Sequence, residues 1–128
     1  MPIRYSLLCC LLIFCCSKPM RVELTSQEKQ ATKDAIERFR QGGSNLDKPH
    51  DIEFIFANGT KVPYNTLRNQ LQAAGLKPDR IAAKGDDVHI HFTMKLDYER
   101  IIDIESRLTY IAHANGVEYD GWGGFQVD

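Results

Sequence analysis

Residues 20–128 contain no cysteine, because all four cysteines of the 128-residue chain lie before residue 17. This part of the chain therefore has no disulfide to hold its fold together, and no thiolate to act as a nucleophile or zinc ligand. Hydrophobic residues make up 43% of the chain and charged residues 26%, an ordinary globular composition. The composition excludes a disordered acidic tail, a collagen-like fibre and a polytopic membrane protein. At this length we expect one domain with one core.

An excess of positive charge is also missing. The whole chain has 16 basic and 17 acidic residues. Setting aside Arg4 and Lys18 leaves 14 basic residues against the same 17 acids in residues 20–128, a net charge of −3. No run of Lys and Arg interrupts this balance. The charge therefore argues against nucleic-acid binding driven by bulk electrostatics, and we expect no direct contact with nucleic acid.

The start of the chain has the pattern of an export leader. Arg4 precedes a run of uncharged residues over 6–16, which is too short to span a bilayer as a helix, since that needs about twenty residues. A basic residue followed by a short apolar segment is the plan of a secretory signal peptide. The cysteine that ends the run is similar to the modified residue of a bacterial lipoprotein box, which predicts lipidation at Cys16. The usual box has a small residue before that cysteine, and here Cys15 stands there.

The alternative is that translation starts at Met20. With the leader, the protein is periplasmic or anchored to the membrane through a lipid on Cys16. With a start at Met20, it is cytoplasmic. We divide the chain into a leader over 1–19, an N-terminal helix and linker over 20–45, and a domain over 46–128.

Residues 20–128 alternate helix and strand patterns. Thr25-Ser26-Gln27-Glu28 fits a capping box and predicts a helix over 26–40. Its apolar stripe is thin, so we expect this helix on the outside of the domain; the stripe consists of Ala31, Ala35, Ile36 and Phe39. Further helices are predicted over 63–74 and 97–115, and strands over 51–57, 78–83, 88–96 and from 117 towards 127.

The strand over 88–96 carries the strongest pattern. Five apolar residues alternate on one face, namely Val88, Ile90, Phe92, Met94 and Leu96, while His89, His91, Thr93 and Lys95 fall on the other. One face therefore belongs to the core, and the other is wet or interfacial. The order β-α-β-β-α-β after the first helix predicts an α+β fold of the ferredoxin-like type. This is a four-stranded antiparallel sheet with two helices on one face, plus the extra N-terminal helix.

His89 and His91 share a face of one strand, but two ligands do not make a metal site. No spacing brings His50 or His113 to them, so we expect no metal. The sequence has no Ser-His-Asp arrangement, phosphate-binding loop or HExxH motif, which predicts no catalysis and no cofactor. The open sheet face also lacks the aromatic residues on which RNA bases stack. It remains a candidate surface for a protein partner.

The segment Tyr119-Asp120-Gly121-Trp122-Gly123-Gly124 places the chain's only tryptophan among three glycines. One hypothesis is structural. The glycines permit a bulge, and Trp122 is at least half buried against the third helix or the adjoining strand, with its N–H bonded to an acceptor. The other hypothesis is a partner-binding corner formed by Tyr119, Asp120 and Trp122, because Tyr and Trp are favoured interface anchors. Both can hold.

The helix over 98–114, followed by Asn115-Gly116-Val117-Glu118-Tyr119-Asp120-Gly121-Trp122, resembles the regulator of ribonuclease E activity B family, also called ribonuclease E inhibitor B. The resemblance covers about residues 51–128. It implies a non-catalytic protein that binds the non-catalytic region of ribonuclease E and modulates RNA decay by protein–protein contact. We expect the partner-binding residues to be Tyr119, Asp120, Trp122, His89 and His91.

The sequence departs from this family in two ways. Members of the inhibitor kind are cytosolic and strongly acidic, whereas residues 20–128 carry only −3 and follow a predicted export leader. Two functions therefore remain open. The first is a protein-binding regulator of ribonuclease E. The second is an exported or lipid-anchored binding module of the cell envelope, with the same fold and a different partner.

Overall fold

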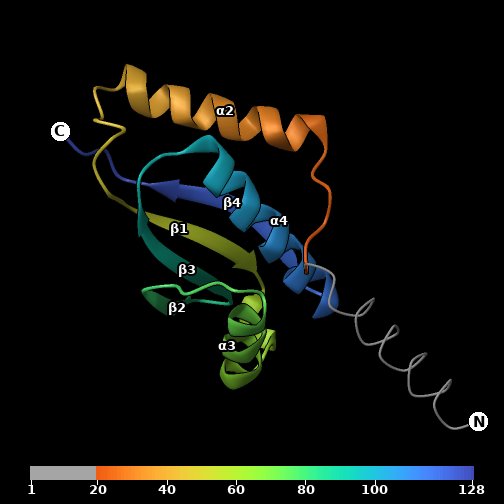
Figure 1. Cartoon of the computed structure of the whole chain (residues 1–128). Coiled ribbons are helices and arrows are strands. Elements are labelled where there is room, and N and C mark those ends of the chain that lie inside the picture. The colour runs from red at the N-terminus through yellow and green to blue at the C-terminus, as the bar shows by residue number, and fades with distance from the viewer. Residues whose placement is uncertain (1–19) are drawn as a thin grey trace, which may run out of the picture.

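The computed structural model describes residues 20–128 (Figure 1). The predicted leader and Cys16 lie outside the described residues. Within 20–128, no helix combines the length and the hydrophobicity needed to cross a membrane.

The described elements follow the predicted order. They are α2 (Ser26–Gln41), β1 (His50–Ala57), the 3-10 turn η1 (Gly59–Lys61), α3 (Tyr64–Ala73), β2 (Arg80–Lys84), β3 (Asp87–Met94), α4 (Tyr98–Ala114) and β4 (Glu118–Gly124). The strands form one antiparallel sheet in the order β2-β3-β1-β4. This order and the helices packed on the sheet confirm the α+β ferredoxin-like fold. In Figure 1, α2 lies along the β4 side of the sheet and α3 lies at the β2 side.

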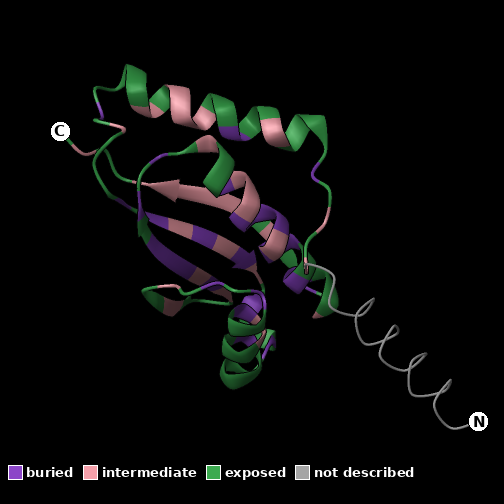
Figure 2. Cartoon of the chain, in the orientation of Figure 1, coloured by how far each residue is buried: buried purple, intermediate pink, exposed green. Residues whose placement is uncertain are grey.

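The core lies between the sheet and the helices, as the alternating patterns predict (Figure 2). Ile52, Phe54 and Phe56 of β1 are completely buried, and Phe54 meets Phe92 of β3 edge to face. The five alternating residues of the segment 88–96 are all buried. On the opposite face of β3, however, His91 is only 4% exposed, so this face is less accessible to solvent than the alternating pattern predicts.

Strand β4 contains a bulge that decides which side chains share a face. Phe54 lies opposite Trp122 and Phe56 lies opposite Tyr119, so one residue of β1 spans two of β4. Gly121 adopts a φ of +94°, which a residue with a side chain rarely adopts. Residues three apart would face opposite sides of a regular strand. The bulge therefore turns Tyr119 and Trp122 to the same side, the one that carries the core.

Helix α2 begins as predicted, with the capping box between Thr25 and Glu28 present in both directions. The predicted apolar stripe is wrong at one position, because Ala31 is exposed and the neighbouring Thr32 is buried. The reason is that α2 packs on α4 and β4 through a polar contact as well as an apolar one. Its apolar contact is Phe39, whose ring stacks on Trp122 with 6.0 Å between ring centroids.

Candidate functional site

The C-terminal corner, formed by Tyr119, Asp120 and Trp122 of β4, is built on a buried polar network. The indole Nε1 of Trp122 donates to Thr32 Oγ1 of α2 at 3.2 Å. The Thr32 hydroxyl in turn donates to the Glu105 carboxylate of α4. The Tyr119 hydroxyl donates to the other oxygen of that carboxylate at 2.7 Å. The network therefore joins three elements through one buried acid.

The hydrogen-bond partners of Glu105 in this network are hydroxyl groups, and burial dominates the electrostatics of its carboxyl. Burial raises the pKa of the Glu105 carboxyl, and the hydroxyl groups of Thr32 and Tyr119 oppose that rise. Burial also raises the pKa of Tyr119 well above its ordinary value, and the adjacent charge of Glu105 adds to this effect. Both groups hold their protons more firmly than in water. Tyr119 and Glu105 bond to each other, and Glu105 also accepts a hydrogen bond from the hydroxyl of Thr32 of α2.

Trp122 lies largely buried with its N–H satisfied, which confirms the structural prediction. Its neighbours are only partly those expected. Phe54 of the adjoining strand lies across from it, but the stacking ring and the hydrogen-bond acceptor both come from the first helix. The sequence interpretation also missed Thr32 and Glu105. Helical spacing contained the signal, since Thr32 is four residues before Ile36, and Glu105 is four residues after the buried Ile101.

Asp120 is exposed beside this network. A cavity of about 270 Å³ opens next to it, lined by Glu28, Ala31, Thr32, Glu105, Tyr119, Gly121 and Trp122. Of the three predicted partner-binding residues here, Tyr119 has its hydroxyl bonded to the buried Glu105, and Trp122 is only partly exposed. Asp120 is the side chain that the fold leaves available to a partner.

His89 and His91 face two carboxylates of β1 on the open side of the sheet. His89 Nδ1 lies 2.9 Å from Glu53 Oε2, and His91 Nδ1 lies 3.1 Å from Asp51 Oδ1. The hydrogen bond from His89 lowers the pKa of Glu53. The open face is therefore a set of cross-strand hydrogen bonds between imidazole rings and carboxylates, and His91, which is buried, contributes little surface to a partner.

Residues 20–128 contain no group of three or more His, Cys, Asp or Glu side chains arranged to hold a metal ion. Each imidazole ring of the open face is engaged with a carboxylate instead. The His91 Nε2 atom has no hydrogen-bond partner, and its nearest acid is Glu53, whose Oε2 lies 3.7 Å away. The structure does not bring His50 or His113 into this group.

Ser44 and His50 form a pair that has the spacing of a nucleophile and its base, with 2.6 Å between Oγ and Nε2. The pair is buried, and its other hydrogen bonds are to backbone groups. His50 Nδ1 donates to the Lys48 carbonyl at 2.8 Å, which leaves Nε2 of the neutral ring to accept from Ser44. Ser44 Oγ also accepts the Val127 N–H at 2.9 Å. The pair therefore fastens the C-terminal tail to the start of β1.

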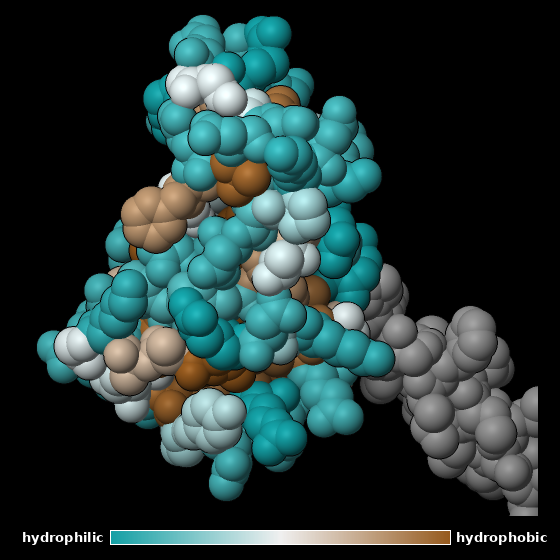
Figure 3. Space-filling model, turned by 90° about the vertical axis from the view of Figure 1, so that its left-hand side faces the viewer, coloured by the Kyte–Doolittle hydropathy of each residue, from teal (hydrophilic) through white to brown (hydrophobic). Residues whose placement is uncertain are grey.

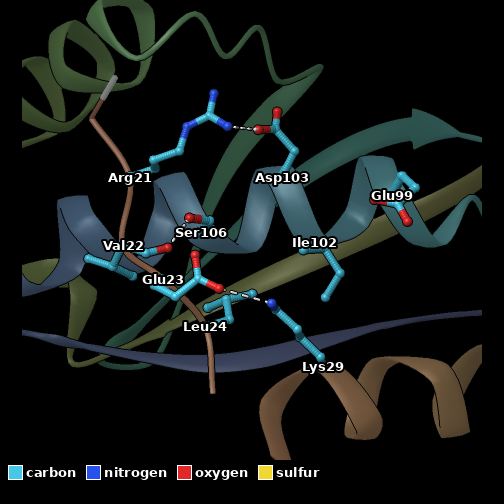
Figure 4. A pocket seen from close by; sticks show the side chains of 9 residues that line it. All are labelled: Arg21, Val22, Glu23, Leu24, Lys29, Glu99, Ile102, Asp103 and Ser106. Carbon is cyan, nitrogen blue, oxygen red and sulfur yellow. Dashed lines mark hydrogen bonds and ion pairs between the residues drawn. The ribbon is translucent and has the colours of Figure 1, made fainter. Parts of the chain in front are cut away.

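A further cavity, of about 510 Å³, lies between the segment before α2 and α4 (Figure 4). Its charged side chains largely pair with one another, as the ion pairs Arg21–Asp103 at 3.1 Å and Lys29–Glu23 at 3.0 Å show. The Val22 backbone bonds to Ser106 on the same wall. These contacts fasten the segment before α2 to α4 and present no set of groups suited to catalysis.

Comparison with known proteins points to a single family. The family model described as regulator of ribonuclease activity B matches residues 29–124, which run from within α2 to the end of β4. A protein of Pseudoalteromonas atlantica named regulator of ribonuclease activity B is 27% identical over 115 residues. The alignment covers 80% of this chain and 98% of that protein.

Proposed function

The chain belongs to the family of regulators of ribonuclease activity B, and from this premise we propose that it regulates a ribonuclease by binding to it, without catalysis of its own. The observation that carries the proposal is the extent of the match, which includes most of α2, the whole sheet and both helices on it. The family relationship thus extends over the complete packed unit.

The chemistry of the site supports a binding role. The buried acid and phenol with raised pKa values, Glu105 and Tyr119, are bonded to each other and enclosed by α2. The Ser44–His50 pair is buried and holds the tail. The groups that most resemble catalytic machinery are therefore engaged in holding the fold together.

We propose ribonuclease E as the partner, because the C-terminal motif resembles that of its inhibitors. The contact would use the exposed Asp120 with the edge of Trp122, and His89 on the open sheet face. Such a contact requires both proteins in the cytoplasm, hence a start at Met20 or a leader that is not processed.

The experiment measures cleavage of an RNA substrate by purified ribonuclease E as this protein is added. We expect cleavage to slow, the two proteins to co-purify, and Asp120→Lys to weaken both effects. Asp47→Lys is the matched control, because it makes the same charge change at another exposed position. Unchanged cleavage and no complex at saturating protein would refute the proposal.

The location of the protein is a separate proposal with its own test. Lipidation at Cys16 predicts that a radioactive fatty acid labels the wild-type protein and does not label Cys16→Ser. Cell fractionation then distinguishes translation from Met1, which includes the leader, from translation that starts at Met20, because the shorter chain stays in the cytoplasmic fraction. Label that persists in the Cys16→Ser variant would exclude lipidation at this residue.

A further inference from the structure

Cavities lie between α3 and the edge strand β2. These two elements stand at the end of the sheet away from α2 (Figure 1). The two neighbouring cavities have volumes of about 310 and 220 Å³. Tyr64 and Ile81 line both of them, so the cavities adjoin along the helix. We call this the α3–β2 groove.

The smaller cavity is apolar and lies at the start of α3. Val62, Leu67, Ala83 and Val88 form its walls with the two shared residues. Tyr64 is 57% exposed, which is unusual for a large aromatic side chain beside an apolar cavity. Figure 3 shows hydrophobic atoms at the molecular surface near its lower end, at the height of α3 and β2 in Figure 1.

The charge around the groove is opposite to that of the rest of the described chain. Residues 60–84 carry five basic side chains, namely Lys61, Arg68, Lys77, Arg80 and Lys84, against one acid, a net of +4. The other residues of 20–128 carry nine basic and sixteen acidic side chains, a net of −7. Charge is thus separated within one small domain, and separation of this kind steers a partner of opposite sign.

Most of this positive charge is not neutralised at close range. Asp79, the acid of the segment, accepts the Thr93 N–H at 2.6 Å. Arg80 and Lys84 reach Asp51 and Glu53 on the open face only at 3.7 and 3.8 Å, and both basic side chains are mostly exposed. Exposed pairs of this length contribute little. Arg80, which lines the larger cavity, therefore keeps its charge available at the rim of the groove, whereas Lys84 adds its charge on the open face of the same edge strand.

Strand β2 also offers backbone groups. It occupies an edge of the sheet and pairs with β3 alone, so its outer edge faces no strand of the described residues. An unpaired edge of this kind accepts an extended segment of another chain, and side chains of that segment enter neighbouring pockets.

We propose that the α3–β2 groove binds an extended acidic segment of the protein partner, with an apolar side chain of that segment seated between Tyr64 and Ile81. The proposal rests on the proposed function for the existence of the partner. It adds a second contact surface, separate from Asp120 and His89, and the chemistry of the bound segment. The apolar cavity holds the anchoring side chain of the segment. The free edge of β2 aligns the segment through backbone hydrogen bonds, and the basic rim favours acidic residues on either side of the anchor.

The test measures the dissociation constant between the full-length protein and the non-catalytic region of ribonuclease E at low and high salt. Tyr64→Ala removes the exposed aromatic wall, and Arg68→Glu reverses a charge at the rim; both positions are exposed, so the fold should persist. Tyr110→Ala and Arg100→Glu are matched controls at exposed positions of α4. Each groove variant should weaken binding about tenfold or more, and the effect of Arg68→Glu should shrink at high salt.

The outcomes separate the two proposals. If the wild-type protein does not bind, the proposed function fails. If it binds and the groove variants bind equally well, the function stands and the groove is not the docking surface. Displacement of the partner by an RNA oligonucleotide from the same groove would also overturn the proposal. So would a dimer of this protein that Tyr64→Ala converts to monomer, because a second copy would then be the occupant.

Discussion

Replacing Trp122 tests whether its ring and its N–H hold α2 on the sheet, as the structure indicates. Trp122→Ala removes both the stacking on Phe39 and the hydrogen bond to Thr32. Trp122→Phe keeps a ring for the stacking but removes the hydrogen bond and part of the packed ring surface. Comparison of the two variants therefore shows how much of the loss an aromatic ring at this position restores.

The expected magnitudes follow from these contacts. Truncation of a fully buried tryptophan costs about 3–5 kcal/mol, and Trp122 keeps an exposed edge, so we expect Trp122→Ala to lower the free energy of unfolding by about 3 kcal/mol. Loss of one neutral hydrogen bond costs about 1 kcal/mol and the smaller ring also loses packing, so we expect Trp122→Phe to lower the free energy of unfolding by about 1–2 kcal/mol. Phe125→Ala, at an aromatic position that is 85% exposed, is the control and should change stability by less than about 0.5 kcal/mol.

The assay is urea unfolding followed by far-ultraviolet circular dichroism, because removing the only tryptophan also removes the fluorescence signal. In the wild type, this single tryptophan reports on α2, since separation of the helix should shift its emission to longer wavelength. Thr32→Val combined with Trp122→Phe should cost less than the sum of the two single changes, because they share one hydrogen bond. Wild-type stability in Trp122→Ala would refute the reasoning and make the residue an exposed anchor.

Three further predictions concern neighbouring positions. Gly121→Ala should destabilise the domain by about 1–2 kcal/mol, because the bulge requires a positive φ at this position; an unchanged urea midpoint would contradict that requirement. Burial raises the pKa of Glu105 in the folded protein above its ordinary value of 4.5, so its contribution to stability is fully present below the unfolded pKa and is lost as pH rises through the folded pKa. Glu105→Gln should abolish that pH-dependent loss, and parallel pH–stability curves for the two proteins would show that the acid is not desolvated. Ser44→Ala removes the acceptor of the Val127 N–H, so hydrogen exchange at that amide should accelerate, whereas a wild-type exchange rate would mean that other contacts hold the tail.

The sequence by itself determined the elements and their topology. Alternation along 88–96 and the apolar stripe of the last helix identify which faces are buried, and these are local patterns with periods of two and 3.6 residues. The right-handed crossover rule then restricts the order of the strands. For these reasons the ferredoxin-like sheet and its two helices could be predicted without a structure. The C-terminal motif likewise indicated the family.

Only the tertiary structure decided how the corner around Trp122 is assembled. Its hydrogen bonds join residues far apart in the sequence, because the residue numbers of Thr32 and Glu105 differ by 73 and those of Thr32 and Trp122 differ by 90. A periodic pattern carries no information about which helix a side chain meets across such a distance. Helical spacing places Thr32 and Glu105 on the buried faces of their helices, but residues of these types are usually exposed, so their chemistry argues against burial. They become interior only when α2 closes over them and each finds its hydrogen-bond partner.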